Sequence, residues 1–167
     1  MKFLLFASLL TVTSAWSLPA MAQTVPDAAK MFASAADIQD FVAKARTQKK
    51  TAGIGTVEPI AKVGPYQMQL EYRTGPTRPA LHHRDAGWAY VVQGSCTFLT
   101  GGTLRDSKPS GPGSTTDVGT AIDGGVARTL AKGDFIMVPP NLPHQFLDIQ
   151  GEFVIVSMHM PMREDAR

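Results

Sequence analysis

The feature that most restricts the fold of this 167-residue chain is a succession of short apolar segments that begins after Gly53. The segments are rich in Val, Ile, Tyr and Phe, and Gly or Pro interrupts them every roughly 8–12 residues, which is typical of successive short β-strands. The 15 Gly and 12 Pro residues favour a turn-rich β protein over a helical bundle. The sequence therefore predicts an all-β sandwich or barrel. The predicted strands are Thr56–Val63, Tyr66–Thr74, Pro79–His83, Gly87–Gln93, Cys96–Thr100, Ala127–Leu130, Phe135–Pro139, His144–Asp148 and Phe153–His159.

The start of the chain has the pattern of a secretory signal peptide. Lys2 precedes the apolar run Phe3 to Val12, and a small-residue cleavage pattern ends just before Gln23. The run is too short to cross a bilayer, which takes roughly 20 apolar residues. We therefore expect residues 1–22 to direct export to the periplasm or to the medium. After their removal we expect no membrane association.

A single helix is predicted between this peptide and the strands. A capping-box pattern starts at Ser34, and apolar residues follow it at helical spacing. Residues 34–49 are therefore expected to form an amphipathic helix that lies on a sheet. The chain then divides into a signal peptide at 1–22, an N-terminal helical segment at 23–52 and a β-barrel at 53–167.

Charge and cysteine content exclude two classes of function. The 16 basic and 14 acidic residues leave a net charge of +2 without a dense basic cluster. Binding to nucleic acid relies on concentrated positive charge, so we expect no nucleic-acid partner. The single Cys96 excludes an intramolecular disulfide and Cys-based zinc sites, and we expect it to be a buried apolar side chain.

Histidines are the main candidates for chemistry. Three of the four lie near predicted strand ends beside Gly and Pro, where side chains can converge at the mouth of a barrel. His82 and His83 are adjacent, so in a regular strand only one of them can face the interior. His144 follows a proline-rich turn that would hold its ring with little loss of entropy.

Two motifs resemble those of the cupin superfamily. The first, G-x5-H-x-H-x3,4-E-x6-G, is matched with a leucine in the first histidine position and a glycine in the glutamate position. The second, G-x5-P-x-G-x2-H-x3-N, is matched with an asparagine for the glycine and an aspartate for the final asparagine. The resemblance covers residues 60–160 and implies a cupin-type double-stranded β-helix (jelly-roll) barrel. The matched positions are Gly75, Leu81, His83, Gly87 and Gly94, then Gly133, Pro139, Asn141, His144 and Asp148.

The resemblance also implies a metal site, of which part is absent here. A typical cupin site places three His and one Glu on a divalent ion such as Mn, Fe, Ni or Zn. In the register above, His83 and His144 are retained. With the four-residue spacing His82 takes the place of His83, and the missing histidine falls at Ala80. Either register leaves two ligands. The candidates to complete the set are Asp85, Glu71 and His159.

Two functions are compatible with these residues. The first is a metal-dependent enzyme of oxygenase, decarboxylase, isomerase or lyase type that acts on a small oxygen-rich substrate. Tyr90 or Glu71 would then be the acid/base group, and the Gly101–Gly125 loop a lid. The second is a non-catalytic cupin that has lost its metal and binds a small ligand in a pocket with aromatic residues such as Trp88, Tyr90 and Phe146. The resemblance is compatible with a homodimer.

A lower-ranked alternative is copper handling by the Met158–Met162 segment. Thioethers and imidazole suit Cu(I). In a strand, however, Met158 and Met160 share one face while His159 takes the other. Methionine is also a common core residue. We therefore favour core packing for these methionines.

Overall fold

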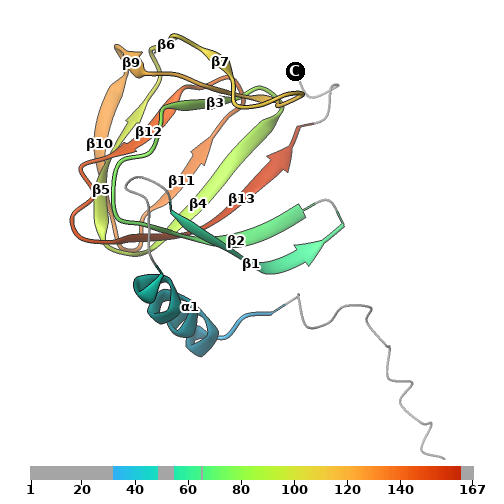
Figure 1. The fold of residues 1–167 in the computed structure, drawn as a ribbon, viewed down its shortest axis with the longest axis vertical. Helices are drawn as coiled ribbons and strands as arrows, with labels where there is room; N and C mark the ends of the chain where they lie inside the picture. Colours follow the sequence, from blue (N-terminus) through green and yellow to red (C-terminus); the bar gives the residue numbers. More distant parts are fainter. Residues whose placement is uncertain (1–31, 49–54, 65, 163–167) are drawn as a thin grey trace, which may run out of the picture.

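The computed structural model describes residues 32–48, 55–64 and 66–162, which form a barrel of two facing β-sheets with one helix against its outside (Figure 1). The larger sheets have the strand orders β1-β2-β13-β4-β11 and β10-β5-β12-β3-β8-β7, and β6 pairs with β9 separately. This is the predicted cupin-type double-stranded β-helix. No helix within these ranges is long and apolar enough to span a membrane. The predicted signal peptide lies outside the described residues.

All nine predicted strands are confirmed, and each boundary agrees to within two residues. The helix α1 spans Ala35–Thr47. The strands are β1 (Thr56–Val63), β2 (Tyr66–Arg73), β3 (Ala80–His82), β4 (Asp85–Gln93), β5 (Ser95–Thr100), β6 (Thr103–Arg105), β7 (Lys108–Pro109), β8 (Thr116–Val118), β9 (Ala121–Asp123), β10 (Val126–Ala131), β11 (Phe135–Val138), β12 (His144–Leu147) and β13 (Phe153–Pro161).

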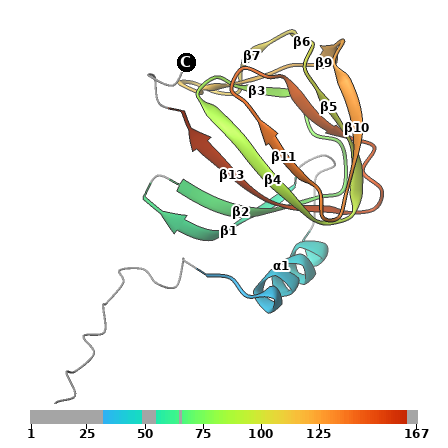
Figure 2. The same ribbon diagram turned by 180° about the vertical axis from the view of Figure 1, so that it is seen from behind.

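The helix begins and packs as predicted. Ser34 and Asp37 form a reciprocal capping box, which satisfies backbone donors that a helix start leaves free. The buried side of α1 contributes Phe41, Val42 and Ala45 to an apolar cluster on the outer face of the five-stranded sheet. Figure 2 shows the same placement from behind, with α1 lying beneath β1 and β2.

Strand alternation divides the side chains of β2 and β13 between two environments. Leu70 and Tyr72 of β2 join Val154 and Val156 of β13 in the cluster under α1. The residues between them face the barrel interior, where a second cluster contains Phe153 and other residues of both sheets. One face of the five-stranded sheet is therefore covered by the apolar cluster under α1, and its other face lines the barrel interior, where a pocket can form.

The turn between β4 and β5 requires glycine. Gly94 has a φ of 82°, and a Cβ at this position would lie 1.9 Å from the carbonyl oxygen of Glu152. The turn leads directly into Cys96, which is 3% exposed. Burial raises the pKa of the Cys96 thiol to about 12. The prediction that Cys96 is a buried apolar side chain is therefore confirmed.

The Gly101–Gly125 segment is a correction to the sequence analysis. It contains four short strands in place of a structureless loop, and β8 lies beside β3 in the six-stranded sheet. β6 and β9 pair with each other. The glycine and serine content predicted a loop, but part of the backbone in this segment is paired in short strands. The structure therefore gives no support to the predicted lid.

Candidate functional site

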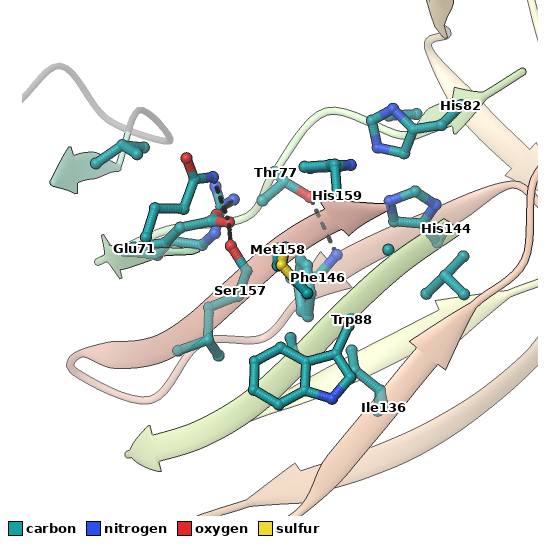
Figure 3. Close-up of a pocket in the computed structure, with 18 of the residues that line it drawn as sticks. Glu71, Thr77, His82, Trp88, Ile136, His144, Phe146, Ser157, Met158 and His159 are labelled. Carbon is teal, nitrogen blue, oxygen red and sulfur yellow. Dashed lines mark hydrogen bonds and ion pairs between the residues drawn. The ribbon is translucent and has the colours of Figure 1, made fainter. Parts of the chain in front are cut away.

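A cavity of about 370 Å³ opens inside the barrel between the two large sheets. Figure 3 shows three histidines at one end of it and the pair Glu71 and Ser157 farther along the wall. Apolar side chains such as Ile136, Phe146 and Ile155 form much of the remaining wall, which also includes Arg73 and Arg78. A concave, mostly apolar site with a few polar groups is the usual form of a small-molecule site.

The histidine cluster consists of His82, His144 and His159, which come from β3, β12 and β13. The ring centre of His82 lies 5.2 Å from that of His144 and 4.5 Å from that of His159. His82 and His144 are partly buried, whereas His159 is exposed at the mouth of the cavity. The two sheets thus contribute imidazoles to one point at the barrel mouth.

Two of these rings are held through their Nδ1 atoms. His82 Nδ1 lies 2.8 Å from the hydroxyl oxygen of Thr116, and His144 Nδ1 lies 3.2 Å from the carbonyl oxygen of Leu142. The Leu142 carbonyl can only accept, so His144 Nδ1 donates, and Nε2 of the neutral ring carries the free lone pair. The Thr116 contact likewise leaves Nε2 of His82 uncommitted.

Burial keeps both rings in the neutral form at physiological pH. Desolvation, together with the neighbouring His159 and His144, lowers the pKa of His82 to about 4. Desolvation also lowers the pKa of His144, although its bond to the Leu142 carbonyl opposes the change. Neutral imidazole is the form that ligates metals.

The other polar group in the cavity is a buried network around Glu71, which is 6% exposed. One carboxylate oxygen accepts hydrogen bonds from Ser157 and Gln69, and the other pairs with Arg73. Burial by itself raises the pKa of Glu71, but Arg73, Ser157 and Gln69 outweigh it and leave the pKa below its usual range. Glu71 is therefore an ionised carboxylate with both oxygens engaged.

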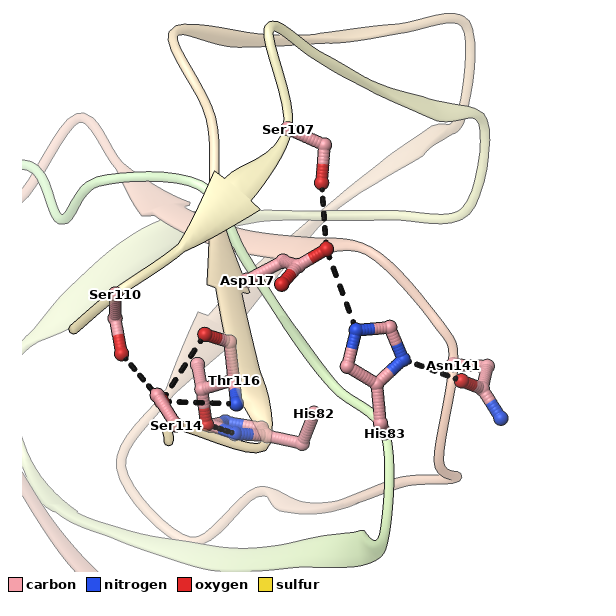
Figure 4. Close-up of polar contacts among 8 residues, drawn as sticks. All are labelled: His82, His83, Ser107, Ser110, Ser114, Thr116, Asp117 and Asn141. Atoms are coloured by element: carbon pink, nitrogen blue, oxygen red, sulfur yellow. Dashed lines mark hydrogen bonds and ion pairs between the residues drawn. The ribbon is translucent and has the colours of Figure 1, made fainter. Parts of the chain in front are cut away.

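Of the two adjacent histidines, His82, the last residue of β3, lines the cavity, whereas His83, which follows the strand, does not. The His83 ring is turned away from the cavity, and its side chain is 45% exposed. Its Nδ1 lies 3.0 Å from the amide oxygen of Asn141, and its Nε2 lies 3.3 Å from a carboxylate oxygen of Asp117 (Figure 4). The prediction of His83 as a metal ligand is wrong for this reason.

Two more predicted site residues lie away from the cavity. Tyr90 is 42% exposed. It lies two residues from Trp88 on the same face of β4 and pairs with Phe135 of the edge strand β11. Asp85 begins β4 opposite Pro161 and does not line the cavity. The acid/base role predicted for Tyr90 and the ligand role predicted for Asp85 are therefore not supported by their positions.

The sequence analysis gave His159 only as one of several residues to complete the set, and its location explains why the motifs missed it. His159 pairs with Gly87, the residue in the glutamate position, across the β13–β4 ladder. A Cβ at Gly87 would meet only the Cβ of Val138, at 3.8 Å. Ala80, the other vacant position, pairs with His144. His159 therefore places an imidazole beside a ligand position that this chain leaves empty.

The donor set suits a divalent transition metal, although it is not a finished site. At metal–nitrogen distances of about 2.1 Å, the ring centres of two imidazoles on one ion lie about 4.6–5.3 Å apart, close to the spacings of this cluster. Within the described ranges, however, no group of three or more His, Cys, Asp or Glu side chains is already arranged to hold an ion. The rings must turn about their side-chain bonds before all three can ligate together.

The Met158–Met162 segment divides as strand alternation predicts. Met158 is partly buried, lies opposite Met68 and Trp88 in the strand ladders of β13, and lines the cavity. His159 contacts His82 at the cavity mouth. Core packing of the methionines of this segment stays a prediction.

Comparisons with known proteins identify the fold. No family model matches the chain, and no curated protein matches it. Among solved structures, a candidate sugar phosphate isomerase from Acidithiobacillus ferrooxidans superposes with a TM-score of 0.52 at 14% identity, over 80% of this chain and 76% of that one. KdgF from Halomonas sp. gives 0.48 at 18% identity, covering 72% and 91%. A cupin-2 domain protein from Shewanella frigidimarina gives 0.47 at 17% identity, covering 75% and 92%.

Proposed function

We propose that this chain, which has the cupin-type double-stranded β-helix fold, is an exported protein that binds a small oxygen-rich molecule in its barrel cavity. We further propose that His82, His144 and His159 hold a divalent transition metal ion there. The observation that carries the proposal is the convergence of three imidazoles from both sheets at the mouth of one cavity.

The chemistry of the bound state follows from the residues. A divalent ion at the cluster would polarise a carboxylate or carbonyl oxygen of the bound molecule or activate dioxygen. Thr116 and the Leu142 carbonyl hold His82 and His144 through their other ring nitrogens, which is how proteins usually orient ligating histidines. The apolar wall around Ile136 and Phe146 excludes water from the body of the ligand.

Glu71 has a supporting part in this proposal. Both of its oxygens are engaged by Arg73, Ser157 and Gln69, so it cannot donate a proton and is poorly placed to accept one. We assign it the task of fixing Arg73 at the cavity wall. Enzymatic turnover, if the protein has it, would then depend on groups at the histidine end of the cavity.

The test is a metal titration with a variant specific to this chain. Protein purified without chelators is analysed for transition metals, and the chelator-treated protein is titrated with Co²⁺ while its visible absorption is recorded. We expect one ion per chain and a loss of at least tenfold in affinity for His159→Gln. Met160→Leu, one residue away on the opposite face of β13, is the matched control and should bind as the wild type does.

A second candidate is a metal-free binding protein, and one observation favours it. The vacant positions Ala80 and Gly87, together with the lack of a ready-made site among the described residues, are what the loss of a metal would leave. In that case the protein takes up no stoichiometric transition metal. His159→Gln would then leave the Co²⁺ titration unchanged, because there would be no specific binding to lose.

Export is tested separately. The proposal rests on the basic, apolar and small-residue pattern of residues 1–22. Expression of the full chain in a Gram-negative host, followed by cell fractionation and intact-mass analysis, should give a periplasmic protein that begins at Gln23. A protein of full mass in the cytoplasm would contradict this part of the proposal.

A further inference from the structure

Arg73 has hydrogen-bonding capacity that the protein itself does not use. Its side chain is 20% exposed and lines the cavity, and one of its terminal nitrogens pairs with Glu71. Its Nε is buried and has no hydrogen-bond partner among the described residues. Buried N–H groups are almost always paired in folded proteins, so the protein itself does not fully satisfy the guanidinium group of Arg73 in this position.

The charge around Arg73 is not balanced within the cavity. Glu71 is the one acidic residue that lines the cavity, and its two oxygens are already engaged. Arg78 also lines the cavity and forms no hydrogen bond or ion pair with another described residue. Two guanidinium groups, of which that of Arg78 is exposed to solvent, and one carboxylate therefore line the cavity. The cavity therefore carries a formal excess of one positive charge.

The shape and lining of the cavity favour an organic anion over an inorganic one. The volume of about 370 Å³ lies at the small end of the usual range for ligand sites, about 300–1,000 Å³. The guanidinium carbon of Arg73 lies 5.6 Å from the ring centre of Phe146, so an apolar surface adjoins the free donor. Guanidinium groups match the planar geometry of a carboxylate.

We propose that Arg73 and Arg78 form a carboxylate-binding subsite in the barrel cavity, which takes a small organic acid with a single negative charge and an apolar body. The inference rests on the proposed function because it assigns the class of molecule bound in that same cavity. Arg73 donates to the carboxylate from its guanidinium group, Arg78 contributes a second positive charge, and the body of the acid lies against Phe146, Ile136 and Ile155. The end of the ligand opposite the carboxylate then faces the histidine cluster.

The experiment compares acids with their neutral amides. Dissociation constants of benzoate and butyrate, of benzamide and butyramide, and of inorganic phosphate are measured by ligand-detected NMR. The protein is used both as purified and after chelation. We expect at least one of the two acids to bind at least tenfold more tightly than its amide and than phosphate.

Variants test whether Arg73 itself, and not the positive charge of the protein in general, is responsible for binding of the acid. Arg73→Lys keeps the pairing with Glu71 but removes Nε, and we expect it to weaken binding of the acid at least tenfold. The double change Glu71→Gln and Arg73→Gln removes both charges together, and it serves as a folded alternative if Arg73→Lys is unstable. Arg128→Gln removes an exposed arginine of β10 outside the cavity and should leave the dissociation constant within twofold.

The outcomes are distinct from those of the metal proposal. Equal binding of acids and amides, equal binding of phosphate, no detectable binding of either acid, or an unchanged constant in the Arg73 variants would each overturn the carboxylate subsite. If the chelated protein binds an acid through Arg73 but takes up no Co²⁺, the subsite holds and the metal proposal fails. If the protein binds Co²⁺ but the Arg73 variants do not change binding of the acid, the metal proposal holds and the carboxylate subsite fails.

Discussion

Two adjacent residues at the end of β3 place identical side chains in opposite environments. His82 faces the cavity, where desolvation lowers its pKa to about 4 and its neighbours are His144 and His159. His83, the next residue, faces solvent and pairs with Asp117 and Asn141. The position of a histidine relative to the cavity, and not its residue type, therefore decides whether its ring can bind a metal ion or a ligand there. The predictions below compare a change on the cavity side with a matched change on the outer side.

The largest difference is expected between two ion pairs. Glu71–Arg73 is buried in the cavity wall, whereas Arg105 and Asp123 pair on the surface with side-chain exposures of 56% and 49%. Removing one partner of a buried pair strands the other charge and costs about 3–5 kcal/mol. We expect Glu71→Ala to lower the free energy of unfolding in urea by about that amount. Asp123→Ala should change it by less than about 1 kcal/mol. Equal losses of unfolding free energy in the two variants would contradict the expected difference between the buried and the exposed ion pair.

A smaller difference is expected in the pH dependence of stability. The pKa of His82 is about 4 in the folded protein and 6.5 ordinarily, so the unfolded chain binds protons more readily. Stability therefore falls as pH drops from about 6.5 toward 4. Each tenfold change in proton affinity is worth about 1.4 kcal/mol, which limits the loss from His82 to about 3 kcal/mol. His144 contributes in the same direction.

Glutamine variants test whether this pH dependence of stability comes from His82 in the cavity. His82→Gln should flatten the decline in unfolding free energy between pH 7 and pH 5, where Glu71 with its lowered pKa does not titrate. His83→Gln, at the adjacent solvent-exposed position, is the comparison variant for the same measurement. Urea titrations at intervals of half a pH unit provide the measurement. A flatter slope in the His83 variant alone would show that the wrong histidine has been assigned to the interior.

A further comparison concerns the hydroxyls that lie behind each histidine. Thr116 contacts His82 Nδ1, whereas Ser107 donates to Asp117, which pairs with His83 (Figure 4). Partners that orient a ligating histidine are worth roughly 10–100-fold in metal affinity. We expect Thr116→Val to weaken Co²⁺ binding about tenfold, and Ser107→Ala to have no effect. A loss of affinity in the Ser107 variant as large as that in the Thr116 variant would remove the distinction.

The smallest effect is expected at Tyr90, on the outer face of β4. Its hydroxyl lies outside the cavity, so Tyr90→Phe should change neither Co²⁺ affinity nor acid binding. Trp88, two residues earlier, differs from Tyr90 because it lines the cavity in addition to packing against the cluster under α1. Trp88→Ala should therefore weaken binding of the acid by removing apolar surface. A clear loss in the Tyr90 variant, measured by the same titrations, would restore the catalytic role expected from the sequence.

Much of the fold could be predicted because its determinants are local. The strand pattern, the capping box at Ser34 and the turn at Gly94 each depend on residues close together in the chain. Regular strands in the Gly101–Gly125 segment could not be predicted in the same way. The pairing of β8 depends on β3, which lies far away in sequence, and the pairs β6–β9 and β7–β8 are formed by residues whose local preference is for turns.

The site was predictable only where a motif marked it. The position of His144 after its proline turn and the presence of Glu71 in the interior agree with the sequence analysis. The choice of His82 over His83 depended on which face of β3 turns inward, and two registers of the motif left this open. His159 belongs to neither motif. It lies beside the cluster because β13 pairs with β4 opposite Gly87, a contact between residues 72 positions apart.

The most direct test of the central claim is calorimetric titration of the chelator-treated protein with Zn²⁺, on the wild type and on two adjacent variants. His82→Gln and His83→Gln make the same chemical change at adjacent positions, one in the cavity wall and one exposed to solvent. We predict one site per chain in the wild type, a loss of at least about 100-fold in affinity for His82→Gln, and a change within twofold for His83→Gln. Absence of a stoichiometric site in the wild type, or equal losses in both variants, would contradict the assignment of the cavity-side histidines as a metal-binding cluster.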